Sequence, residues 1–285
     1  MVPIIPLDII ETIVDILINS HPSDDSDTTG LQDVKAFSLT CKSFLPFCRK
    51  HIFSSIQIKM ENRTWASIGM PTGEAFEQLL SETPAIAKYV RQLTIHIIQE
   101  SHSWPSYAFD RVPRQLTRLQ SLKVSIWRHS RTSSDWNDLS SSIQCSILNL
   151  IHLPTLSHLG LTGIGNFPIS NLITCANLKH LSIEDLHIAT GHDEVASSSL
   201  QNSMQLQALD IQISGSETLG LLAARCPDGR SVLDFTVLEK ISISFDLDFA
   251  WRDAAGPTQE IFRKAQRLTD MRLTSNEIFN IQFQK

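Results

Sequence analysis

A six-residue pattern, LxxLxL in its simplest form, recurs eight times along this chain of 285 residues. Its copies read FSSIQI at 53, VRQLTI at 90, LQSLKV at 119, LSHLGL at 156, LKHLSI at 178, LQALDI at 206, LEKISI at 238 and LTDMRL at 268. The residue that follows each copy counts as its seventh position. Across the third, fifth and seventh positions of all copies only Ala208 is apolar, although 42% of the chain is hydrophobic. Alternation with a period of two predicts β-strands that bury one side and expose the other.

The copies start 22 to 37 residues apart, which leaves room for a helix in most units. Helix-like runs lie between them at 73–90, 141–153, 216–226 and 257–268. A strand, a helix and a second parallel strand form the expected unit, and such units stack because none can bury its apolar edge alone. A doubly wound α/β domain is the alternative, which the 22-residue unit and the missing glycine-rich phosphate loop disfavour.

The N-terminal stretch PLDIIETIVDILI, at 6–18, predicts a helix with an unusually wide apolar side. At 100° per residue its aliphatic residues fill about 200°, whereas a surface helix needs an apolar stripe only a little over about 100° wide. Helical spacing resumes over 31–39 and continues over 41–52, with Pro46 as a break or a first-turn residue. Three short helices can hardly bury all these side chains against each other, so the surplus needs a partner or another layer of the same chain.

The runs IPLDIIETIVDIL, LQDVKAFSLTCKSF and RKHIF make residues 4–53 similar to an F-box. The resemblance implies a helical module over 4–52 that docks on a Skp-type adaptor of a cullin-based ubiquitin ligase. The adaptor-binding residues that it implies are Pro6, Leu7, Ile9, Ile10, Ile13, Leu39, Cys41 and Phe44.

Residues 53–285 resemble an irregular leucine-rich-repeat horseshoe, an α/β solenoid. Most units lack the family's Asn or Cys after the strand, and only Asn276 occupies that position. An F-box joined to such repeats implies a substrate receptor of an SCF-type ligase, whose repeats hold a client protein. The third, fifth and seventh positions would line the client-binding face, and its principal residues are His96, Lys123, His158, His180, Glu184, Asp210, Lys240 and Arg272.

The amino-acid composition limits the kinds of partner and the cell compartment that we expect for this chain. The net charge of −6 argues against a general nucleic-acid binder, and no apolar stretch reaches the length of a membrane span. Acidic residues inside the apolar N-terminus argue against a secretory signal. The five cysteines contain no CxxC pair and predict buried free thiols in a reducing compartment, the cytoplasm or the nucleus.

Catalytic chemistry has little support in the sequence. No P-loop, HExxH or GxSxG pattern occurs, so we expect neither an enzyme nor a cofactor. His158 and His180 should lie about 5 Å apart on neighbouring strands. With Glu184 they could bind a metal, but solvent-facing polar residues are the favoured interpretation. The arginines and the lysine within 111–131 could hold a phosphorylated segment or form a solvated face.

The sequence is also compatible with two other functions. The chain could be a repeat scaffold whose N-terminal helices only cap the solenoid. It could also be an unrecognised enzyme on an irregular α/β domain.

Overall fold

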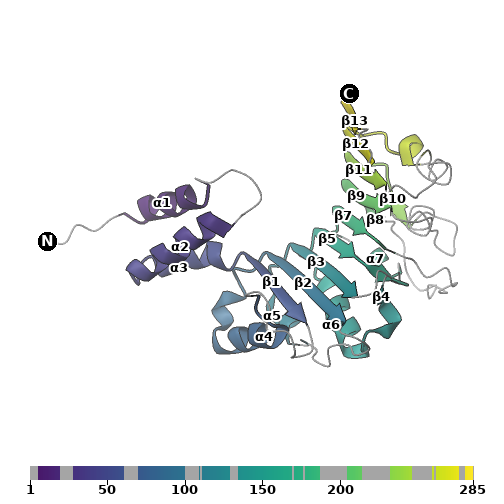
Figure 1. Cartoon of the computed structure of the whole chain (residues 1–285). Coiled ribbons are helices and arrows are strands. Elements are labelled where there is room, and N and C mark those ends of the chain that lie inside the picture. Colours follow the sequence, from purple (N-terminus) through teal and green to yellow (C-terminus); the bar gives the residue numbers. More distant parts are fainter. Residues whose placement is uncertain are drawn as a thin grey trace.

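The computed structural model describes residues 6–19, 28–60, 70–99, 109, 111–128, 134–168, 170–175, 177–186, 204–213, 232–245, 259, 261–275 and 280–284. Three helices come first: α1 (Leu7–Asn19), α2 (Thr28–Thr40) and α3 (Leu45–Ile52). They match the helices that the sequence predicts, and Pro46 lies in the first turn of α3. A nine-stranded sheet occupies most of the remaining chain (Figure 1).

The nine strands follow one another across the sheet in chain order. They are β1 (Ser55–Met60), β2 (Gln92–Gln99), β3 (Ser121–Arg128), β5 (His158–Thr162), β7 (His180–Glu184), β9 (Ala208–Ile213), β11 (Lys240–Phe245), β12 (Asp270–Ser275) and β13 (Asn280–Gln284). The first eight are parallel, and β13 pairs with β12 in the antiparallel sense. A doubly wound sheet reverses its strand order at a switch point, and this sheet does not.

The eight repeated sequence segments are the eight parallel strands, which confirms the prediction from alternation. Each strand begins at the third position of its copy, from Ser55 in β1 to Asp270 in β12. Hydrogen-bonded pairing joins equivalent positions of neighbouring copies, for example Ser121 with His158 and His158 with His180. The polar positions of all copies therefore share one face of the sheet.

The same backbone contact recurs between all consecutive pairs of these eight strands. The amide groups of Arg91 and Gln92 both donate to the carbonyl oxygen of Ser54, and those of Gln120 and Ser121 donate to Arg91. Five further pairs of donors repeat the contact along the sheet, with all donor–acceptor distances between 2.8 and 3.1 Å. The sequence repeat is thus also a repeat of backbone geometry.

Helices cover the apolar face of the sheet (Figure 1). They are α4 (Gly73–Glu82), the 3-10 turn η1 (Pro84–Ile86), α5 (Val112–Gln115), α6 (Ser141–Ile151) and α7 (Ser170–Ile173). A second 3-10 turn, η2 (Trp136–Asp138), precedes α6. The short ladders β4 (Ser134–Asp135) with β6 (Ile164–Gly165) and β8 (Met204–Gln205) with β10 (Leu233–Asp234) complete the described elements.

Of the predicted helical runs, 73–90 forms α4 and η1, and 141–153 forms α6. Residues 259 and 261–264 of the run at 257–268 are helical, whereas the run at 216–226 lies outside the described residues. None of the helices in the described ranges combines the length and the hydrophobicity that crossing a membrane requires.

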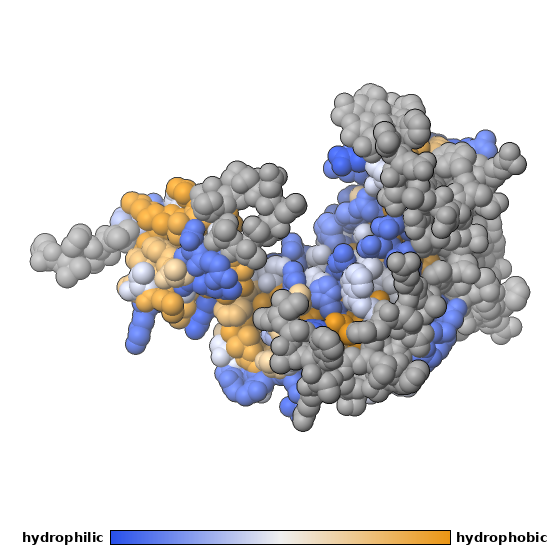
Figure 2. All heavy atoms as spheres, in the orientation of Figure 1, coloured by the Kyte–Doolittle hydropathy of each residue, from blue (hydrophilic) through white to orange (hydrophobic). Residues whose placement is uncertain are grey.

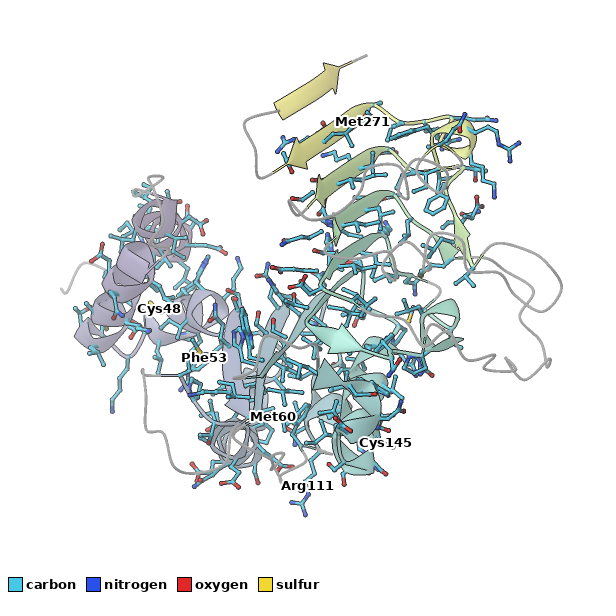
Figure 3. The ribbon with its side chains drawn as sticks, turned by 45° about the vertical axis from the view of Figure 1, so that its right-hand side comes forward. Cys48, Phe53, Met60, Arg111, Cys145 and Met271 are labelled. Atoms are coloured by element: carbon cyan, nitrogen blue, oxygen red, sulfur yellow. The ribbon has the colours of Figure 1, made fainter. Side chains whose placement is uncertain are left out.

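The described apolar side chains form two separate cores. The larger core lies between the sheet and its helices and includes Leu122, Phe76 and Ile147. The smaller core lies inside the three N-terminal helices around Val14, Val34 and Cys48. Figure 3 shows Cys48 among these helices and Phe53 where the chain passes from α3 to the sheet.

Candidate functional site

The wide apolar side of α1 divides into an inner and an outer face. On the helical wheel that starts at Leu7, buried Ile10 and Val14 lie at about 300° and 340°. Ile9, Ile13 and Ile16 lie at about 180° to 240°, and their exposed fractions are 47%, 36% and 58%. Figure 2 shows this hydrophobic surface over the N-terminal helices. Within the described residues, the chain leaves the outer face uncovered.

The packing of α2 against α1 places an exposed leucine of α2 toward the end of the module where α1 begins. A β-carbon on Gly30 would lie only 2.9 Å from the carbonyl oxygen of Ile18, so the start of α2 packs closely against the end of α1. Val34 and Val14, nearer the middle of each helix, share one core, so the two helices run in opposite directions. Leu39, at the end of α2 and 87% exposed, therefore lies toward the same end of the module as Leu7.

Ion pairs attach α3 to the polar side of α1. The Nζ atom of Lys50 lies 3.0 Å from Oε1 of Glu11, and Nε2 of His51 lies 3.3 Å from Oδ1 of Asp15. Burial lowers the pKa of His51, although the carboxylate of Asp15 raises it in part. These contacts use the acidic side of α1, away from its outer apolar face.

The structure places most of the predicted adaptor-binding residues at the surface. Those exposed are Pro6, Leu7, Ile9, Ile13, Leu39 and Cys41. The ring of Phe44 is half-buried and stacks on Phe37 with 4.6 Å between ring centroids. Ile10, by contrast, is only 3% exposed and faces the interior of the module. Sequence reasoning missed Ile16, whose place on the outer arc was visible in the helical wheel.

The prediction that the cysteines are buried thiols is correct for two of the four described. Cys48 and Cys175 are buried, and burial raises the pKa of both thiols, that of Cys175 to about 11. Cys41 and Cys145 are exposed, which corrects the prediction. The hydroxyl of Ser43, 2.9 Å from the Cys41 sulfur, lowers the pKa of that thiol. Cys226 lies outside the described residues.

The predicted client-binding residues all belong to the polar face of the sheet. Lys123, His158, Lys240 and Arg272 are exposed there. The half-buried members are His96, His180, Glu184 and Asp210. The parallel register joins them across strands, so one surface carries residues from distant parts of the chain.

Two histidines at the middle of this face touch, as the sequence predicts. The ring centroids of His158 and His180 are 5.3 Å apart. Nε2 of His180 lies 2.6 Å from Oδ2 of Asp210, and Nδ1 of His158 lies 2.8 Å from the Ser157 hydroxyl. Burial and, to a smaller extent, the neighbouring His180 lower the pKa of His158.

Glu184 does not join the two histidines. Its carboxylate accepts a hydrogen bond of 3.3 Å from the Thr162 hydroxyl, while Asp210 pairs with His180. In the part of the chain that the structure describes, no three acidic, histidine or cysteine side chains are grouped as a metal site would require.

The arginines of 111–131 do not form one surface with Lys123. Arg111, Arg114 and Arg118 are exposed at or next to α5, on the helical side of the sheet, and Figure 3 shows Arg111 pointing away from the strands. Lys123 projects from the opposite, polar side. The side chains of Arg128 and Arg131 lie outside the described residues.

Sequence reasoning missed a large hydrophobic residue that is exposed on the polar face, Trp127. Trp127 continues the alternation of β3 two residues beyond Ser125, and its side chain is 55% exposed. The signal was present in the sequence, because a residue that extends the period-two series must face the same side.

Comparison of the chain with models of protein families gives no match, and comparison with curated proteins gives none either.

Proposed function

We propose that this chain is the substrate-recognition subunit of an SCF-type ubiquitin ligase. Residues 4–52 dock on a Skp-type adaptor, and residues 53–285 form a leucine-rich-repeat horseshoe that holds a client protein. The chain carries no catalytic group of its own and acts in the cytoplasm or the nucleus by positioning the client for ubiquitin transfer.

One observation carries the adaptor half of this proposal: the outer face of α1 is apolar, and none of the described residues covers it. Ile9, Ile13 and Ile16 expose aliphatic surface along one side of the helix, and Leu7 and Leu39 extend it at one end. Contiguous exposed apolar surface of this kind marks a protein interaction site. Its residues largely coincide with those that the resemblance to an F-box implies.

The repeat half is supported by the regularity of the parallel strands. Equivalent positions pair in register, and the two-donor backbone contact recurs between neighbouring units. Such stacking of similar units is the organising feature of solenoid proteins, which often use the extended strand face for binding. The strand face is polar, carries both signs of charge and has no proposed catalytic group, and such a surface suits the binding of a folded protein.

The scaffold alternative, in which the three helices only cap the repeats, has less support. A cap would bury the apolar side of its helices against the first strand. Instead the helices have their own core around Val14 and Val34, separate from the core of the sheet. In Figure 1, α1 lies away from β1.

Binding to an immobilised Skp-type adaptor, measured by biolayer interferometry with the full chain, tests the proposal. The double change Ile9→Asp with Ile13→Asp places two charges on the outer face and should weaken binding by at least about 100-fold. Met70→Asp is the matched control, because Met70 is an exposed apolar residue outside the three helices. It should leave adaptor binding unchanged.

Two results would contradict the adaptor half. The wild-type chain could fail to bind the adaptor, or the double variant could bind as well as the wild type while its helices stay folded by circular dichroism. The scaffold function would then become the better explanation of the helices. Ile10→Asp is unsuitable for this test, because the residue is buried and the change would unfold the module.

A further inference from the structure

On the polar face of the sheet, the described residues include a large apolar side chain that reaches solvent. Trp127 projects from the end of β3 and pairs in register with Ile98 on β2. Ile98 is half-buried and lies on the same face, so the two side chains form a small apolar platform among polar neighbours.

The turn after β5 ends the strand pairing of β3 with β5 beside this platform. The pairing of β3 with β5 ends at Ser125 and Thr162, two residues before Trp127. The chain then turns at Gly163, which has a φ of +70°. A β-carbon on Gly163 would overlap the carbonyl oxygen of Ile126, so glycine permits this close turn. No residue of β5 therefore pairs with Trp127.

Small side chains lie beside the platform on the polar face. Ser125 is 1% exposed and Thr162 is 7% exposed, and the Thr162 hydroxyl donates a hydrogen bond to the carboxylate of Glu184. Lys123 and Trp127, on the same strand as Ser125, are exposed. The aromatic ring of Trp127 is therefore the large apolar group that a partner's side chain can meet on this part of the face.

The fixed charges on this half of the face have one sign. Strands β1 and β3 contribute Lys59 and Lys123 to the polar face, and the described residues of β1, β2, β3 and β5 contribute no carboxylate there. Carboxylates begin at β7 with Glu184 and continue with Asp210 and Asp270. Asp210 is already paired with His180, and Asp270 lies 3.9 Å from Arg272.

Lys123 is the exposed fixed charge nearest to the platform on its own strand. Its stem lies against β5, where a β-carbon on Gly160 would be 3.3 Å from Cγ of Lys123. The side chain is exposed, and it takes part in none of the ion pairs between described residues.

We infer that the client presents a short acidic segment with one apolar side chain, which packs on Trp127 and Ile98 while a neighbouring carboxylate meets Lys123. This inference rests on the proposed function, because it names the kind of client segment that the repeats would take. Apolar contact supplies most of the affinity, and the lysines set the preference for acidic sequence.

Selection of random dodecapeptides displayed on phage against the immobilised full-length chain tests the inference. The selected peptides should carry net negative charge and one large apolar residue. A fluorescein-labelled copy of the strongest peptide then serves as the probe in anisotropy titrations. Trp127→Ala should weaken its binding by about 30-fold, and Lys123→Ala should weaken it by about 5-fold at low salt.

Lys88→Ala is the matched control. Lys88 is exposed in the turn between η1 and β2, outside the polar face of the strands. Its removal should leave the affinity for the peptide unchanged. Lys123→Glu is a second variant that is safe for folding, because Lys123 is exposed, and it should reduce the affinity further than Lys123→Ala.

Several results would overturn the inference. The selection could yield no peptide, or peptides that are neutral or basic, or peptides that bind equally well to the Trp127→Ala and Lys123→Glu variants. Binding of a labelled 20-nucleotide uridine RNA that depends on Trp127, in place of peptide binding, would assign the platform to nucleic acid instead.

Adaptor binding by the same variants separates this inference from the proposed function. Trp127→Ala should keep full affinity for the Skp-type adaptor, and the Ile9→Asp, Ile13→Asp variant should keep full affinity for the peptide. If the wild type binds the acidic peptide through Trp127 but binds no adaptor, the ligase role fails while the peptide site stands.

Discussion

Ile9 and Ile10 are neighbours in sequence, but we expect their shortening to alanine to have very different effects. Each change removes the same atoms and introduces the residue with the highest helix propensity. Ile10 is 3% exposed and Ile9 is 47% exposed. Removing a buried isoleucine side chain costs about 2 to 5 kcal/mol. For Ile10→Ala we expect about 3 kcal/mol, which corresponds to about a 100-fold increase in the opening of the helix.

Ile9→Ala should change the stability of α1 by no more than about 0.5 kcal/mol. About half of the Ile9 side chain is already in water, and the higher helix propensity of alanine offsets part of the lost contact. The same change should weaken adaptor binding, because it removes aliphatic surface from the outer face. Ile9 would thus matter for binding and Ile10 for folding.

Hydrogen–deuterium exchange read by mass spectrometry measures both effects within one helix. Peptides that cover residues 6–18 should exchange about 100-fold faster in Ile10→Ala and at nearly the wild-type rate in Ile9→Ala. Peptides that cover β3 are the internal control, because the sheet has a separate core. Equal acceleration by the two changes, or a larger effect of Ile9→Ala, would refute the division of α1 into a buried and a free apolar face.

Two further predictions follow from the thiols and the histidines. Iodoacetamide at pH 8 should modify Cys41 well before Cys48 and Cys175. Cys41 is exposed and its pKa is lowered, whereas burial raises the pKa of the other two thiols. Peptide mapping measures the modification, and rapid modification of Cys175 in the folded chain would contradict this prediction. Burial holds the pKa of His158 below its usual 6.5, so the unfolded chain binds this proton more readily and the free energy of unfolding should fall as the pH drops below about 6.5. His158→Asn should reduce the slope of stability against pH in urea titrations, and an unchanged slope would show that His158 does not contribute.

Local periodicity was enough to predict the strands. A residue's side of a strand depends only on whether its position is odd or even, so the copies at 119 and 156 placed Lys123 and His158 on one face before any coordinates were known. The alternation of polar and apolar residues has the same phase in every copy. It therefore also predicted the contact between His158 and His180, because parallel strands align equivalent positions. The same rule extended by two residues would have found Trp127.

The tertiary structure alone decided how the apolar side of α1 is shared. The helical wheel shows that Ile9 and Ile10 are both part of a wide apolar arc, but not which of them faces the other helices. That choice depends on where α2 packs, and the close approach of Gly30 to the end of α1 fixes it. Periodicity is a property of the local backbone, whereas burial depends on contacts between residues far apart in the chain, which the pattern of one helix does not contain.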